Sequence, residues 1–190
     1  TADGFTATGG SDGSYPYRYV NQTGTNYLSW NWLATDSFDP TTDGTVTTAS
    51  GQRNVTAGFS IVGYQGEASA MTIGHGLSQT PDWVIVKNRG NGTNWPTHYG
   101  ASNRVVWLDE DGETEAAGTA YWNDTDPTAT VFSVGDSSQT NDSSHTFVAY
   151  CFHSIDGYSS FGKSYGGNSS TNGTFVWLGF RPAWLAIKGT

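Results

Sequence analysis

The sequence predicts an all-β protein, an antiparallel β-sandwich of the jelly-roll, concanavalin-like type, assembled from repeated units. Three observations lead to this prediction. Short apolar or alternating runs are separated by turn-forming residues, the composition is rich in Gly, Ser, Thr and Asn, and the sequence shows no convincing apolar period of 3.6 residues. Short hydroxyl and amide side chains compete with the helical backbone for hydrogen bonds, so this composition favours strands and turns.

The runs that have the length and apolar content of strands are 27–33, 58–64, 83–87, 104–108, 130–134, 147–152, 175–180 and 184–188. The nearest approach to a helix is 113–117, which is too short to be stable alone. We expect the large rings of these strands to fill the space between two sheets. These inward aromatic residues are Trp30, Trp32, Trp83, Trp107, Tyr150, Phe152 and Trp184.

Two parts of the sequence are repeated. Residues 21–32 align with 141–152 without a gap, and polar, hydroxyl and aromatic positions coincide. A second pair opens with Gly58-Phe-Ser and Gly157-Tyr-Ser, and each member ends in Pro-x-Trp-x-x-x-Lys. A period of roughly one hundred residues has the size of a sandwich rather than of a solenoid rung.

This repeat order predicts the domain organisation. We expect 1–33 to be the end of a preceding sandwich unit or its shared strands, 34–57 a linker or loop, 58–152 one complete sandwich unit, and 153–190 the start of a following unit or closing strands.

Composition excludes several classes of function. The net charge is −9 and only eight residues are Lys or Arg, which argues against nucleic-acid binding. No run of about 18 apolar residues is present, so we expect no membrane insertion. The single Cys151 excludes an internal disulfide framework, and its apolar surroundings predict a small buried core residue.

The best candidates for ligand contact lie in the loop 90–100. Aromatic rings stack on sugars and amides bond their hydroxyls, which makes Trp95 and Tyr99, with Asn91 and Asn94, a candidate glycan site. The alternative is that Trp95 packs over the end of the sandwich. A second candidate set for ligand contact consists of Tyr15, Tyr17 and Tyr19. The alternative for these tyrosines is that they alternate along one edge strand.

Metal and catalytic patterns are weak. Asp109 and Asp111 are weak calcium candidates, but the run lacks the acidic twelfth ligand of an EF-hand because residue 120 is Ala, so we expect no metal. His75 and His98 each lack a second ligand at a usual spacing and are expected to be structural. Ser, His and Asp occur without a nucleophile elbow, so the sequence predicts no enzyme and no cofactor.

Several short sequence motifs resemble those of a family of repeated β-sandwich domains of uncharacterised function, found in predicted tail-fibre and other virion proteins of marine and cyanobacterial phages. These motifs include residues 27–32, 58–61, 74–77, 83–89, 122–125, 148–152 and 179–182, whereas 1–19 and 104–118 match poorly. The resemblance implies a concanavalin-like sandwich on a virion surface or in another extracellular position, and it brings no catalytic or binding residues.

The leading functional expectation is therefore a viral appendage module, such as part of a tail fibre, that contributes to attachment by contacting host-surface glycan. We expect self-association, as a homotrimer or a fibre or filament assembly, which would cover exposed strand edges. One alternative is a purely structural subunit of a virion, capsid decoration or extracellular filament that has no ligand. Another is a non-catalytic carbohydrate-binding module of a secreted enzyme.

Overall fold

The computed structural model describes residues 5–7, 21–112, 115–162 and 165–189. The chain divides into two compact units, Thr1–Trp32 and Leu33–Thr190. In the first unit, the described residues 21–32 form a turn followed by extended chain and contribute to neither sheet. The second unit holds every strand and the helix of the described part of the chain.

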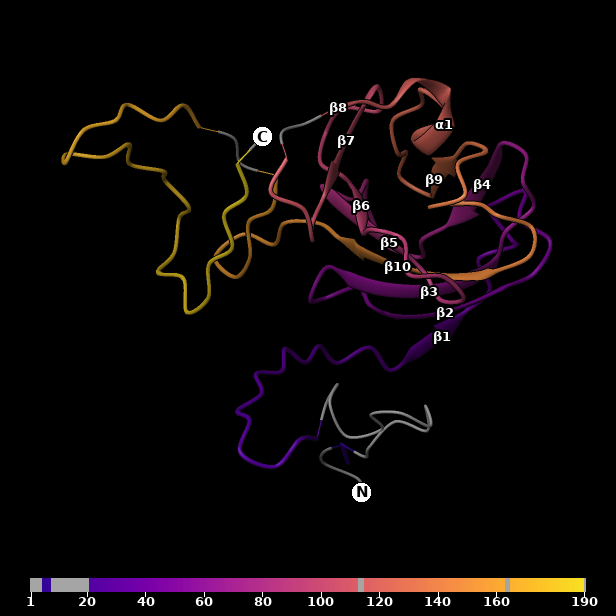
Figure 1. The fold of residues 1–190 in the computed structure, drawn as a ribbon, viewed down its shortest axis with the longest axis horizontal. Coiled ribbons are helices and arrows are strands. Elements are labelled where there is room, and N and C mark those ends of the chain that lie inside the picture. The colour runs from indigo at the N-terminus through magenta and orange to yellow at the C-terminus, as the bar shows by residue number, and fades with distance from the viewer. Residues whose placement is uncertain (1–4, 8–20, 113–114, 163–164, 190) are drawn as a thin grey trace. The chain divides into compact units, whose positions relative to one another are not determined.

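The large sheet has the strand order β1-β2-β3-β10-β5-β6-β7-β8, and every neighbouring pair is antiparallel. These strands are β1 (Asp36–Phe38), β2 (Ala49–Asn54), β3 (Phe59–Gln65), β5 (Trp83–Asn88), β6 (Pro96–His98), β7 (Arg104–Trp107), β8 (Glu115–Ala116) and β10 (Thr146–Phe152). A second sheet pairs β4 (Met71–Gly74) with β9 (Val131–Val134). Figure 1 shows this pair and the short helix α1 (Gly118–Trp122) on one side of the large sheet.

The main core lies between the large sheet and the layer formed by β4, β9 and α1. Successive side chains of a strand point to opposite faces, and alternate residues of β3, β5 and β10 are accordingly almost completely buried. The buried cluster includes Val62, Tyr64, Val84, Val86, Phe147, Ala149 and Cys151 from the large sheet, and Met71, Ile73, Trp122, Phe132 and Val134 from the opposite layer. The protein is therefore nearly all β with antiparallel sheets, as predicted.

Five of the predicted strands are confirmed: 58–64, 83–87, 104–108, 130–134 and 147–152 correspond to β3, β5, β7, β9 and β10. Cys151 is buried in the core, also as predicted. None of the described residues forms a helix that is long and apolar enough to cross a membrane.

Three predicted strands are wrong. Residues 27–33, 175–180 and 184–188 are extended or irregular and belong to neither sheet. The side chains of Trp30, Trp32 and Trp184 are 56%, 47% and 48% exposed, so they do not fill the core of the sandwich. Local alternation shows that a segment can form a strand, but a strand forms only where a neighbouring strand completes its backbone hydrogen bonds.

One further expectation needs correction. The segment 34–57, predicted as a linker or loop, supplies β1 and β2, whose polar sequences give little apolar signal because both lie toward one edge of the sheet. Within 113–117, the stretch nearest to a helical pattern, Glu115–Ala116 pairs with β7 as β8, and α1 begins after it at Gly118.

The predicted inward aromatic residues also divide between two faces. Trp107 packs against the main core, but Phe152, Trp83 and Tyr150 belong to a separate cluster. Because these three alternate with core residues along β5 and β10, they lie on the outer face of the large sheet.

Candidate ligand-binding site

An aromatic cluster covers part of the outer face of the large sheet. Phe59, Ile85 and Phe152 are buried there, and Ala34, Ile61, Trp83, Trp95, Tyr150 and Phe161 pack against them while remaining partly exposed. The register explains the arrangement, because Phe152 of β10 lies opposite both Phe59 of β3 and Trp83 of β5. The ring centroids of Phe152 and Trp83 are 5.5 Å apart, and those of Phe152 and Phe59 are 5.0 Å apart.

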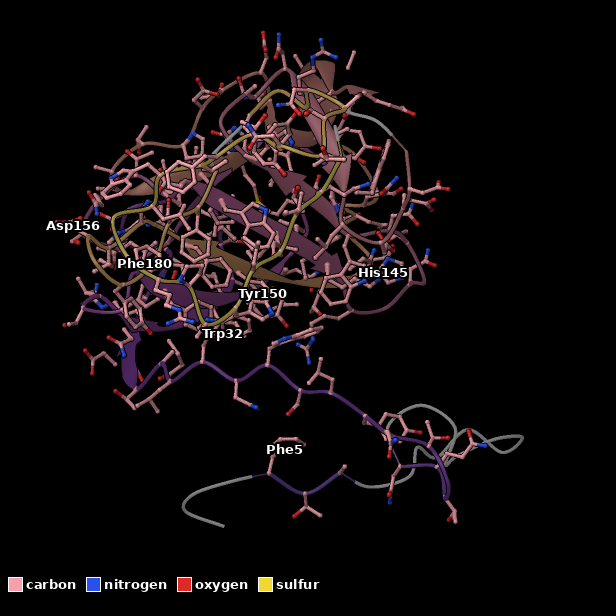
Figure 2. The ribbon with its side chains drawn as sticks, turned by 90° about the vertical axis from the view of Figure 1, so that its left-hand side faces the viewer. Phe5, Trp32, His145, Tyr150, Asp156 and Phe180 are labelled. Atoms are coloured by element: carbon pink, nitrogen blue, oxygen red, sulfur yellow. The ribbon has the colours of Figure 1, made fainter. Side chains whose placement is uncertain are left out.

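A groove of about 410 Å³ lies beside this cluster on the same sheet. It is lined by Ser50, Gly51, Gln52, Ile61, Gly63, Arg89, Val148 and Tyr150. Register brings the lining together, because Gly63 of β3 lies opposite Ser50 of β2 on one side and Val148 of β10 on the other. Figure 2 shows the Tyr150 side chain on β10.

Gly63 has no side chain, and this keeps the middle of the groove open. A Cβ atom at this position would meet no atom closer than 3.7 Å, the nearest being Ser50 Oγ. The missing side chain therefore reflects open space above the sheet rather than close packing of the backbone. A glycine inside an alternating strand often marks such a place, where another molecule can approach the backbone.

The groove combines an aromatic ring with polar side chains. Tyr150 is partly buried, and its ring lies nearly parallel to that of Trp95, with centroids 6.5 Å apart and an interplanar angle of 15°. Ser50, Gln52 and Arg89 are exposed. The amide of Gln52 donates to Ser37 Oγ at 2.8 Å, which restrains its orientation. An apolar floor with a few oriented polar groups is typical of small-ligand sites.

Trp95 does pack against the protein, but on the outer face of the large sheet rather than over the end of the sandwich. Its ring packs against the outer cluster, and Lys87 Nζ lies 6.0 Å from the ring centroid. The same ammonium group donates to the carbonyl oxygens of Asn88, Asn91 and Thr93, which holds the loop before Trp95. Asp109 Oδ1 accepts a hydrogen bond from the Trp95 backbone N–H at 2.8 Å.

The four residues predicted as one glycan site are therefore spread out. Trp95 stacks on Tyr150, which lines the groove, while Asn91 is exposed and Asn94 is partly buried in the preceding loop. Tyr99 lies beyond β6 and lines a different cavity.

That second cavity measures about 370 Å³ and is lined by Thr80, Pro81, Asp82, His98, Tyr99, Gly100, Asp126, Pro127, Phe161 and Gly162. His98 Nε2 lies 3.5 Å from Asp126 Oδ1; the His98 side chain is 3% exposed and that of Asp126 68%. Burial lowers the pKa of His98 despite the neighbouring carboxylate, which opposes the shift. The imidazole packs edge-on against Trp122 and is part of the wall of the cavity.

His75 is a structural residue, as its sequence context suggests. It is completely buried, the Leu77 backbone N–H donates to its Nδ1 at 3.1 Å, and its Nε2 lies 3.2 Å from the Thr128 carbonyl oxygen. The bond to Nδ1 makes Nε2 the protonated nitrogen and the donor to Thr128. Burial lowers the pKa of His75, which favours this neutral form.

The calcium candidates do not come together as a ligand set. Asp109 orients the Trp95 backbone, and Asp111 is exposed. Across the described ranges, no group of three or more His, Cys, Asp or Glu side chains could hold a metal ion. Tyr15, Tyr17 and Tyr19, the second aromatic candidates, lie outside the described residues.

Comparison with protein families gives one match. A model described as "Domain of unknown function (DUF7483)" matches residues 1–190. The chain belongs to the DUF7483 family. No curated protein matches this DUF7483 domain, and no solved structure matches it.

Sequence reasoning missed most of the groove in the DUF7483 domain. Tyr150 was expected inside the sandwich, and Gln52 lies in a segment expected to be a linker. The available signal was Gly63, a glycine in the middle of an otherwise apolar alternating strand. The partners that complete the groove come from β2 and β10, and only strand register brings them together.

Proposed function

We propose that this DUF7483 domain is a non-catalytic glycan-binding module of a viral surface appendage, such as a tail fibre, and that the sugar binds in the groove on the outer face of the large sheet. The observation that carries the binding proposal is the stacked pair of Trp95 and Tyr150 beside a groove with Gly63 at its centre. The viral and extracellular setting is supported by the sequence resemblance, as are repeated sandwich units of jelly-roll type.

The chemistry of the groove suits a sugar. One face of a pyranose ring is lined by C–H groups and packs on an aromatic ring such as Tyr150, which Trp95 holds in place. The hydroxyl groups at the sugar's edge need donors and acceptors, which Ser50 and Gln52 supply from the β2 side of the groove and Arg89 from the β5 side. The guanidinium group of Arg89 also suits a carboxylate, so an acidic sugar is the preferred class of ligand.

The proposal is tested with a variant that fills the groove. In Gly63→Val the new Cβ has ordinary contacts, the nearest atom being 3.7 Å away, and a β-branched residue suits a strand. The variant should therefore fold, while its methyl groups occupy the space of the ligand. Thr146→Val is the matched control, because Thr146 is exposed and lies on the same face of β10, two residues from Val148.

Binding is screened on a glycan array and measured by calorimetry with the sugar that scores best. We expect Gly63→Val and Trp95→Ala to weaken binding by about tenfold or more, and Thr146→Val to leave it unchanged. If the wild-type protein binds no sugar, or if Gly63→Val binds as well as wild type, the proposal is wrong.

A purely structural subunit is the second candidate, because large side chains are exposed near the C-terminal end: Phe175 is 81% exposed and Trp177 is 76% exposed. Such surfaces on a soluble protein often mark contacts with other proteins. This function predicts that no variant binds sugar. Imaging the particle that carries the chain would separate a virion appendage from a binding module of a secreted enzyme.

A further inference from the structure

Three segments that contribute no strand to either sheet repeat the sequence pattern of the three strands at the centre of the large sheet. In that sheet β10 lies between β3 and β5. By sequence, residues 27–32 align with 147–152 of β10, residues 158–162 with 59–63 of β3, and residues 184–188 with 83–87 of β5. The chain therefore carries a second set of segments with the pattern of a central strand and both of its neighbours.

The two sets differ in burial. Leu185 and Ile187 align with Val84 and Val86 of β5; the leucine and isoleucine are 64% and 65% exposed, whereas both valines are completely buried. On the β3-like segment, Tyr158 is 62% exposed, against 4% for its counterpart Phe59. None of the three segments of the second set contributes to either sheet in the described structure.

Exposed apolar side chains at these positions are costly, because removing apolar surface from water is favourable. The first set, β3, β10 and β5, is already assembled in the large sheet and shows how such side chains can be removed from water. In that set the β10 strand forms backbone ladders with both β3 and β5. A β10-like strand placed between the β3-like and β5-like segments would do the same for the second set.

We infer that copies of this chain associate head to tail by strand insertion, with residues 27–32 of one copy lying between residues 158–162 and 184–188 of the next. The register follows from that of the assembled set. Phe152 lies opposite Phe59 and Trp83, so Trp32 lies opposite Tyr158 and Trp184 of the neighbouring copy. Cys151 lies opposite Ser60 and Val84, so Asn31 lies opposite Ser159 and Leu185.

The occupant is a second copy because every copy carries both halves of the interaction. The β10-like donor and the β3- and β5-like acceptor are different segments, so the contact is heterologous and repeats from copy to copy. Heterologous contacts of this kind build closed rings or open filaments. Strand insertion is also a general mode of recognition, in which the main chain supplies affinity and alternate side chains supply specificity. The groove lies outside all three segments, so this assembly does not rest on glycan binding.

The first experiment uses one proline on each side of the contact. Proline lacks the backbone N–H and is excluded from central strands, so Ser29→Pro disables the donor and Ala186→Pro disables the acceptor. Both residues are exposed and lie outside the sheets, so the sandwich should keep its melting temperature. Ser29→Val and Ala186→Val are the matched controls, because valine favours a strand.

Mass is measured by light scattering after size-exclusion chromatography over a range of concentrations. Wild type and both valine variants should form species larger than a monomer, and each proline variant alone should be monomeric. An equimolar mixture of Ser29→Pro and Ala186→Pro should give a heterodimer and nothing larger, because one intact donor meets one intact acceptor. A wild-type protein that stays monomeric, proline variants that assemble like wild type, or a mixture that stays monomeric would each overturn the inference.

The second experiment tests the register with a cross-link between copies. Asn31→Cys in one copy and Leu185→Cys in another should form a disulfide, because directly opposed residues in an antiparallel pair are about 4.5–5.5 Å apart between Cα atoms. The native Cys151 is buried and does not compete. In the control, Ala186→Cys replaces Leu185→Cys; a shift of one residue turns the thiol to the other face, so cross-linking should fall. Equal cross-linking by the two pairs, or none by either, would overturn the register.

Discussion

Asn141 connects three segments of the chain inside the protein. Its side chain is completely buried, and Nδ2 donates to the carbonyl oxygens of Ser69 and Gly135, each at 2.6 Å. Its Oδ1 accepts from the Glu67 backbone N–H at 2.7 Å. The amide thereby joins the turn before β4 to the segment that follows β9. We expect Asn141→Ala to be strongly destabilising.

The loss of stability can be estimated from the three backbone groups that lose their hydrogen-bond partner. Each hydrogen bond contributes about 1 kcal/mol net, and a buried polar group left without a partner costs about 1–3 kcal/mol, so the free energy of unfolding should fall by about 3–5 kcal/mol. For a chain of about 150–250 residues each kcal/mol moves the melting temperature by about 2–4 °C, which predicts a drop of about 10 °C.

The assay is urea unfolding followed by tryptophan fluorescence and circular dichroism, with the slope of the transition compared between variants. Asn168→Ala is the matched control. Asn168 Nδ2 donates to the Asn172 carbonyl oxygen and its Oδ1 accepts from the Ser170 N–H, but at an exposed turn. The control should lose less than about 0.5 kcal/mol. A loss below about 1 kcal/mol in Asn141→Ala would refute the reasoning, because water would then replace the amide at little cost.

Two further predictions concern ionisable groups. Burial lowers the pKa of His75 and His98 in the folded protein, so protons bind more tightly to the unfolded chain. Stability should therefore be complete above the unfolded pKa of about 6.5 and fall as the pH drops below it, which thermal melts between about pH 8 and pH 5 will show. His98→Gln should reduce that slope, whereas a melting temperature that rises on acidification would mean that the ion pair with Asp126 outweighs burial. Burial raises the pKa of Cys151 to about 12, so a thiol reagent should label it only when the chain unfolds; rapid labelling of the native protein would contradict this.

Much of the strand content could be predicted because its signals are local. The alternation along 59–65 and 146–152 and the apolar run at 83–88 are visible within a few residues, and all three are strands. The polar strands β1 and β2 carry no such signal, because a strand near the edge of a sheet needs fewer apolar side chains. Conversely, 184–188 has the pattern of a strand without belonging to a sheet, because the pattern does not say where a partner strand lies.

The candidate site was less predictable because it depends on register. Trp95 and Tyr99 are four residues apart, yet β6 lies between them and they line different parts of the surface. Tyr150 and Gln52 are distant in the sequence, yet β3 lies between their strands and brings both to one groove.

Residue patterns alone were enough to predict the all-β class, five of the strands and the buried position of Cys151, and to reveal the repeat of the central-strand pattern. Each of these depends on neighbouring residues or on the likeness of two stretches. The folded arrangement was needed to show which face of the large sheet carries Tyr150 and Phe152, and which residues surround Gly63. Those features depend on strands that are joined by pairing across long stretches of chain, and a one-residue change of register would turn every side chain of a strand to the other face.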